Sequence, residues 1–240
     1  MCGVPRPALA DQKTTTPCDL LETIDLDSPC LTELHHVLTQ VTLESDVEDG
    51  SQVRSLPNLT VRYGLTNNLE LLFVPPTDLL GENISGFGAT GSGIKAGMGS
   101  GRLFEAVAVT STSGNGSSGL TDAPNVTGTV SAAYALTDTV NISPAITVSS
   151  SAYSDGGLRI PTTRRTFSTD FEFDFADRWE TQLVLGQTLF HSREVQNYDT
   201  VELDQRYMIR ENVGITVGVE RSFGADNRET DVTMSGAVLF

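Results

Sequence analysis

Charged side chains recur at every second position of several segments, which is the spacing that places residues on one face of a β-strand. In the segment 167–175, phenylalanines share one face, and Asp170, Glu172 and Asp174 lie on the other. The same surroundings cannot suit both faces, because buried carboxylates need water or a paired charge. The segment therefore predicts a strand that separates an apolar medium from an aqueous interior.

The same alternation assigns thirteen charged residues to an inner, pore-lining face. Ten of them are acidic and three are basic, so an enclosed interior would carry surplus negative charge. Rings of carboxylates favour cations. Buried charges must be paired, so about half of the set is expected to brace the wall through salt bridges. The set is Arg62, Glu70, Lys95, Glu105, Asp170, Glu172, Asp174, Glu180, Glu202, Asp204, Arg206, Glu220 and Asp231.

Histidine, a frequent general base in hydrolytic sites, occurs at three positions. His35 and His36 are adjacent and His191 is distant in the chain, and no nucleophile elbow or base–carboxylate pattern accompanies them. Barrel-shaped hydrolases exist, so hydrolysis is kept as a minor alternative. The expected interpretation is three histidines in exposed loops, no catalytic residues and no enzyme activity.

Two motifs that could hold a cofactor or a metal lack the surroundings that such sites need. Residues 86–91 (GFGATG) match the dinucleotide fingerprint Gly-x-Gly-x-x-Gly, but they follow a proline-containing loop and open no helix. The acidic residues 46–50 lack the spacing of a calcium loop and are predicted to form a solvated turn. Cys18 and Cys30 have no further ligands for zinc. We therefore expect no cofactor and no metal site.

The composition excludes several classes of protein. The 240 residues contain 15 Lys+Arg against 31 Asp+Glu, which gives a formal net charge of −16. Nucleic acid is therefore not an expected partner, because a phosphate backbone requires a basic surface. No run of 18 apolar residues is present, so no membrane-spanning helix is predicted. A membrane-spanning strand is compatible with this hydropathy, because only every second side chain meets lipid.

A turn pattern recurs at intervals of 33 to 39 residues. In each copy an aromatic or apolar residue enters a tight polar turn, and a second apolar residue leaves it six positions later. The repeats are rich in Gly, Ser, Thr, Val and Asn rather than in helix formers, so each one fits a membrane β-hairpin. The entering residues are Tyr63, Met98, Tyr134, Phe173 and Tyr207, and Phe240 ends the chain at the same interval.

The predicted fold is an all-β, transmembrane, antiparallel up-and-down β-barrel of about 12 strands over residues 34–240, since bacterial single-chain barrels have an even number of strands. Closure is required because an open sheet edge in lipid leaves backbone groups unpaired. Five short corners are expected on the side of both termini. Six long loops are expected on the other side, near 45–52, 75–90, 111–123, 150–163, 191–198 and 224–229.

Aromatic residues gather at the end of the strands that carries the short corners. This is where an interfacial girdle belongs in a membrane barrel, whereas a soluble sandwich has no reason to collect aromatics at one end. The residues concerned are Tyr63, Tyr134, Trp179, Tyr207 and Phe240.

The first 33 residues differ from the rest. Ala8-Leu9-Ala10 is typical of a signal-peptidase site, so residues 1–10 are expected to be the remnant of a signal peptide that begins upstream and is removed. Residues 11–33 are polar without a clear period, and we expect a periplasmic lead-in or a partial plug. Cys18 and Cys30 can form a disulfide in an oxidising compartment, and two incidental free thiols are the alternative.

Residues 55–71 (SLPNLTVRYGLTNNLEL) resemble the signature of outer-membrane barrels of the family named "MetA-pathway of phenol degradation", or simply transporters. Residues 27–33, 41–45 and 93–95 are similar to the same family. The resemblance covers residues 25–100 in detail and the rest of the chain only in pattern. It implies a bacterial outer-membrane location, with the C-terminal Phe240 as the signal recognised by the barrel-assembly machinery.

These patterns together predict a monomeric channel in the bacterial outer membrane, surrounded by lipid, for the passive passage of small solutes. The family resemblance extends the solutes to small hydrophobic or aromatic compounds. The acidic inner face predicts a mild preference for cations. Two alternatives stay open, namely a non-conducting structural or adhesive barrel and a barrel hydrolase.

Overall fold

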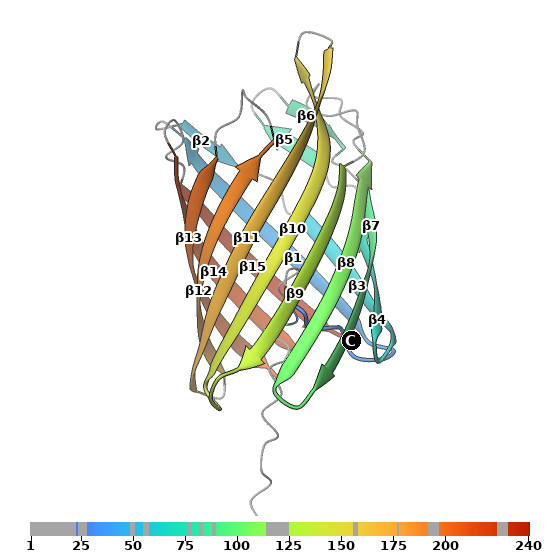
Figure 1. Cartoon of the computed structure of the whole chain (residues 1–240), viewed down its shortest axis with the longest axis vertical. Helices are drawn as coiled ribbons and strands as arrows, with labels where there is room; N and C mark the ends of the chain where they lie inside the picture. The colour runs from blue at the N-terminus through green and yellow to red at the C-terminus, as the bar shows by residue number, and fades with distance from the viewer. Residues whose placement is uncertain are drawn as a thin grey trace, which may run out of the picture.

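The computed structural model describes residues 23, 28–48, 51–54, 58–75, 78–81, 84–87, 90–113, 125–155, 158–176, 178–191, 197–224 and 230–240. Within these ranges one sheet of thirteen strands curls into a closed barrel (Figure 1). Twelve of these strands form the wall, and each pairs antiparallel with its neighbours. In the same described ranges, no helix combines the length and the apolar character needed to cross a bilayer.

The wall strands follow one another around the barrel in sequence order, as an up-and-down topology requires. They are β1 (Val37–Glu48), β3 (Asn58–Thr66), β4 (Leu69–Val74), β7 (Thr90–Ser100), β8 (Leu103–Ser113), β9 (Asn125–Ala135), β10 (Val140–Asp155), β11 (Leu158–Ala176), β12 (Trp179–Phe190), β13 (Tyr198–Arg210), β14 (Val213–Phe223) and β15 (Thr230–Leu239). The predicted fold class and strand number are thereby confirmed.

The barrel closes where β15 meets β1. The two strands pair from Leu38 opposite Leu239 to Val47 opposite Thr230. At the end of the seam, the Val37 amide donates to the Phe240 carbonyl at 3.1 Å, and the Phe240 amide donates to the Val37 carbonyl at 2.9 Å. The first and last wall strands therefore leave no free edge, which is the condition for placing a sheet in lipid.

The two faces of the wall are inverted relative to a water-soluble protein. Large apolar side chains such as Phe73, Val130 and Leu203 are exposed on the outside, with 48%, 57% and 49% of their surface accessible. Charged side chains such as Arg62 and Glu70 are fully buried on the inside. Along β3, the buried residues Thr60, Arg62 and Gly64 alternate with less buried neighbours, and this period of two produces the separation. The outer face is therefore complementary to an apolar medium rather than to water.

The short turns lie together at the end of the barrel that also carries the C-terminus (Figure 1). Exposed aromatics gather there: Trp179 packs edge-on against Tyr207 with ring centroids 5.9 Å apart, and Tyr134 and Phe240 are exposed at the same end. This is the arrangement that a membrane-interface girdle requires.

Three of the predicted long loops are partly β-structure, and those predictions were wrong in extent. In the predicted loop 150–163, β10 and β11 remain paired as far as Asp155 opposite Leu158, and their hairpin projects beyond the rim (Figure 1). In the predicted loop 45–52, β1 continues to Glu48 and pairs with β2 (Ser51–Arg54). A third loop, near 75–90, contains the separate hairpin of β5 (Asp78–Gly81) and β6 (Ile84–Phe87). Strand pairing does not stop where the hydrophobic pattern stops, because the backbone hydrogen bonds can continue outside the membrane.

Candidate functional site

The inner face of β11 to β15 carries its acidic residues in rows, because the strand registers align them. Asp174 lies opposite Glu180, and Glu180 lies opposite Arg206. Two more rows follow at positions farther from the short turns. The third row consists of carboxylates and one valine. The second row contains Glu172, Gln182 and Asp204, and the third contains Asp170, Val184, Glu202, Glu220 and Asp231.

Arg206 is the centre of a buried cluster on this wall. Its Nη1 donates to Glu180 Oε1 at 3.0 Å, and the two side chains are only 4% and 2% exposed. Its Nη2 donates to the amide oxygen of Gln182, which is fully buried. Gln182 was missing from the sequence prediction, which included charged residues only. It lies two positions after Glu180, and this spacing places both side chains on the same face of the strand. The cluster braces β12 against β13.

A polar cavity of about 340 Å³ opens beside this cluster in the barrel interior. Four of its lining residues are carboxylates and one is a guanidinium, so the cavity wall carries surplus negative charge. Uncharged residues of β1 and of β11 to β15, most of them Gln, Ser and Thr, complete it. The charged lining residues are Asp170, Glu202, Asp204, Arg206 and Glu220.

A second cluster lies on the inner face of β3, β4 and β7. Arg62 holds Glu70 with two parallel hydrogen bonds, Nε to Oε1 at 2.8 Å and Nη2 to Oε2 at 3.1 Å. Both side chains have no exposed surface. Lys95 lies opposite Glu70 in the register of β4 and β7 and is 1% exposed. Glu70 therefore sits between two cations, in the bidentate geometry that makes a charged hydrogen bond strong.

Residues 28–35, here named the lead-in segment, cover this second cluster. The Thr32 amide donates to Glu70 Oε2 at 2.6 Å, and Arg62 Nη2 donates to the Cys30 carbonyl at 3.3 Å. Arg62 also donates to the Thr23 carbonyl. Because Arg62 and Glu70 belong to the inner face, the lead-in segment lies inside the mouth of the barrel. Whether it blocks passage, as the prediction of a partial plug for residues 11–33 requires, stays a prediction.

Gly64 allows the lead-in segment to approach the wall. A Cβ at this position would overlap the carbonyl oxygens of Glu33 and Thr32. Leu34 forms a parallel bridge to Gly64, and the His35 amide donates to the Gly64 carbonyl at 2.8 Å. His35 itself adopts the left-handed conformation, with φ of 64°, where the chain turns from the lead-in segment toward β1. Only glycine fits at position 64, because any side chain there would overlap the backbone of Thr32 and Glu33.

The lead-in segment does not fill the end of the barrel. A cavity of about 570 Å³ lies between it and the wall formed by β7 and β8. Pro29, Leu31 and Thr32 line one side, and Gly97 and Phe104 line the other.

Twelve of the thirteen predicted pore-lining residues lie on the inner face: Arg62, Glu70, Lys95, Asp170, Glu172, Asp174, Glu180, Glu202, Asp204, Arg206, Glu220 and Asp231. Their role in lining a conducting pore stays a prediction. The register pairs Asp46 of β1 with Asp231 of β15, although the sequence had assigned Asp46 to a turn.

The placement of Glu105 on the inner face was wrong. Glu105 is exposed on the outer face together with Val107 and Val109, whereas Ala106 and Ala108 are buried inside. The segment is apolar on both faces, so the single carboxylate decided the prediction. Side-chain size decides the structure, because the small alanines fit the interior and the valines face outward.

The cysteine prediction is tested on one side only. Cys30 is disulfide-bonded and fully buried. Cys18 lies outside the described residues, as do residues 1–10, so the predicted pairing of Cys18 with Cys30 and the predicted signal-peptide remnant stay predictions.

The histidines lie at two ends of the barrel. His35 and His36 lie just before β1 at the short-turn end, and His191 follows the far end of β12. In the part of the chain that the structure describes, no group of three His, Cys, Asp or Glu residues could hold a metal ion.

Comparison with known proteins defines the fold. No protein-family model and no curated protein matches the sequence, so membership of the phenol-degradation family stays a prediction. Similar solved structures include a NanC porin, with a TM-score of 0.63 and 8% identity over 82% of this chain and 98% of that chain. A KdgM porin in complex with disordered oligogalacturonate has a TM-score of 0.59 and 11% identity over 83% and 98%. A bacterial polysaccharide outer membrane secretin has a TM-score of 0.51 and 10% identity over 85% and 98%. The chain therefore has the closed-barrel fold of outer-membrane porins.

Proposed function

We propose that this chain is a channel of the bacterial outer membrane that passes small solutes passively, as a monomer and without catalysis. The observation that carries the proposal is the inverted wall: a closed barrel with apolar side chains outside and charged residues around a cavity of about 340 Å³ inside. Membrane lipid is the surrounding medium that suits such an outer face, and the barrel-assembly machinery is the partner that would insert it.

The distribution of charge supports a preference for cations. With Glu105 removed, the inner set contains nine acidic and three basic residues, and eight of the acidic ones lie on β11 to β15, where Arg206 is their one basic companion within the set. A wall of carboxylates raises the local concentration of cations and opposes anions. This wall is polar, so it favours small hydrophilic or cationic solutes; the hydrophobic or aromatic solutes implied by the family resemblance stay a prediction.

A non-conducting barrel is the second candidate, and one observation favours it. Arg62, Glu70 and Lys95 are at most 1% exposed, and the lead-in segment is hydrogen-bonded to the first two. The cavity of about 570 Å³ beside the segment argues for residual space at that end. The two candidates therefore differ in whether the interior is continuous.

Single-channel recording in planar bilayers separates the two candidates. The purified protein, inserted from detergent, should give discrete conductance steps, and a sample unfolded by heating before insertion should give none. Stable insertion without steps would favour the structural barrel and contradict the channel.

A further inference from the structure

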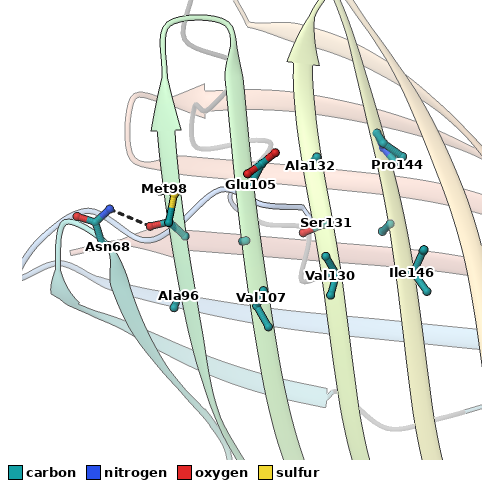
Figure 2. A pocket seen from close by; sticks show the side chains of 13 residues that line it. Asn68, Ala96, Met98, Glu105, Val107, Val130, Ser131, Ala132, Pro144 and Ile146 are labelled. Atoms are coloured by element: carbon teal, nitrogen blue, oxygen red, sulfur yellow. Dashed lines mark hydrogen bonds between the residues drawn. The ribbon is translucent and has the colours of Figure 1, made fainter.

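A groove of about 810 Å³ lies on the outer face of the barrel over β7, β8, β9 and β10 (Figure 2). It is almost entirely apolar and lies close to the short-turn end. Figure 2 shows that two levels of side chains form it. The level farther from the turns contains Ala96, Val107, Val130 and Ile146, which are aligned by register, and the nearer level contains Met98, Glu105, Ala132 and Pro144.

The outer surface is hollowed here because smaller residues interrupt both levels. In the nearer level, Ala132 and Pro144 are smaller than Met98. In the farther level, Ala96 is smaller than Val107, Val130 and Ile146. A groove of this size falls within the range of ligand-binding pockets. An acyl chain is the apolar ligand that a groove on a lipid-facing wall meets.

Glu105 is the one acidic side chain in this groove (Figure 2). Within the described residues, no hydrogen bond or ion pair involves it. A charged pair at the rim, Arg102 with Asp138 at 3.5 Å, is formed by two neighbouring short turns. Glu105 therefore offers an exposed negative charge next to an apolar surface, with which a cationic group can pair.

The depth of Glu105 matches the headgroup region of a bilayer. In the register of β8 and β9, Leu103 lies opposite Tyr134, and Glu105 lies opposite Ala132, two positions farther from the turn. Tyr134 belongs to the exposed aromatics of the short-turn end, and such aromatics sit at headgroup level. Glu105 thus lies just inside the girdle, where an amine headgroup and its acyl chain meet.

We propose that the groove binds one phospholipid with a primary-amine headgroup, of the phosphatidylethanolamine type. Its ammonium group would pair with Glu105, its phosphate would lie toward Arg102 at the rim, and an acyl chain would cover Val107, Val130 and Ile146. The proposal rests on the proposed function, because it requires the outer face to lie in a bilayer. Charge complementarity selects this lipid over one with an anionic headgroup.

Native mass spectrometry of the intact barrel in detergent tests the proposal. The probe is an equimolar mixture of phosphatidylethanolamine and phosphatidylglycerol with the same acyl chains. The unaltered protein should retain one phosphatidylethanolamine with a preference of about two- to five-fold, as expected for one charged pair at a partly exposed site. Glu105→Gln should bring the ratio of the two lipids close to one. The matched change Glu211→Gln, at an exposed carboxylate of the β13–β14 turn, should leave the preference unchanged.

A second variant tests the shape of the groove. Ala132→Leu fills it without changing its charge, and should reduce retention of both lipids while the barrel still shifts on an unheated gel. Equal retention of the two lipids by the unaltered protein, or an unchanged preference in Glu105→Gln, would overturn the proposal. A dimer that Ala132→Leu abolishes would assign the groove to a second copy instead. A chain that stays soluble without detergent and binds no lipid would overturn the proposed function itself.

Discussion

Arg62 and Glu70 show how a charged pair can be both buried and structurally necessary. Each has no exposed surface, and each also holds the lead-in segment, Glu70 through the Thr32 amide and Arg62 through the Cys30 carbonyl. Burying such a pair is costly, and removing one partner is worse than removing both, because an uncompensated charge is left behind.

Substituting Glu70→Ala should therefore lower the free energy of unfolding by about 3–5 kcal/mol. Urea unfolding in detergent, followed by the fluorescence of Trp179, the single tryptophan of the chain, measures this loss. The matched control is Glu33→Ala in the lead-in segment. The Glu33 side chain is exposed, and its ion pair with the imidazole of His36, at 3.7 Å, is a weak surface contact. It should change stability by no more than about 1 kcal/mol. Equal effects of the two substitutions would contradict the role assigned to the buried pair.

Gly64→Ala should displace the lead-in segment while leaving the wall intact. The added methyl group would overlap backbone oxygens of Thr32 and Glu33, which have no flexible side chain that could yield. In planar bilayers the mean conductance should rise, because the covered end of the barrel opens. Gly128→Ala is the control, since a Cβ at Gly128 meets nothing within 4 Å. An unchanged conductance in Gly64→Ala, with the barrel still folded, would show that the segment does not restrict passage.

At the scale of the strands, the sequence predicted most of the wall and failed where both faces of a strand are similar. The alternation of Phe171 and Phe173 with Glu172 leaves one possible orientation in lipid. In β8 both faces are apolar, so the orientation depends on side-chain size and on the neighbouring strands, and Glu105 was placed on the wrong side.

The contacts that position the lead-in segment could not be predicted from the sequence either. Its contacts with Arg62, Glu70 and Gly64 join residues that are 29 to 38 positions apart, and nothing in the local pattern of residues 28–35 identifies these partners. The short turns, in contrast, were predictable because Gly, Asn and Thr mark them locally.

The end of β15 combines the barrel seam with the predicted assembly signal. The Phe240 backbone is hydrogen-bonded to Val37, whereas its ring is 69% exposed and packs little against the protein. Phe240→Ala should therefore change the stability of the assembled barrel by less than about 0.5 kcal/mol, yet reduce the amount that reaches the outer membrane in cells. Met234→Ala, at an exposed outer position of the same strand, should leave that amount unchanged. Equal yields of the two variants in the membrane fraction would remove Phe240 as the signal.

At the scale of the whole molecule, the closed barrel itself is open to a simple test. A barrel with every wall strand paired resists detergent, so an unheated sample should migrate differently from a boiled one on a denaturing gel. Identical migration of the two samples, together with solubility in the absence of detergent, would contradict the transmembrane barrel.

The charges of the interior are divided unequally between two walls. The wall of β3, β4 and β7 carries Arg62, Glu70 and Lys95 under the lead-in segment, and the wall of β11 to β15 carries the surplus of carboxylates around the polar cavity. An ion that crosses the barrel would therefore meet mainly negative charge. Neutralising carboxylates on that wall should change the ion selectivity more than any change at the rim.

The reversal potential across a salt gradient in a planar bilayer tests this account most directly. The unaltered channel should show the sign of cation selectivity, and the double substitution of Glu202→Gln with Glu220→Gln should move the potential toward zero. The rim substitution Glu211→Gln should leave it nearly unchanged. An anion-selective sign, or a potential that does not respond to the double substitution, would contradict the acidic wall as the selective element of the channel.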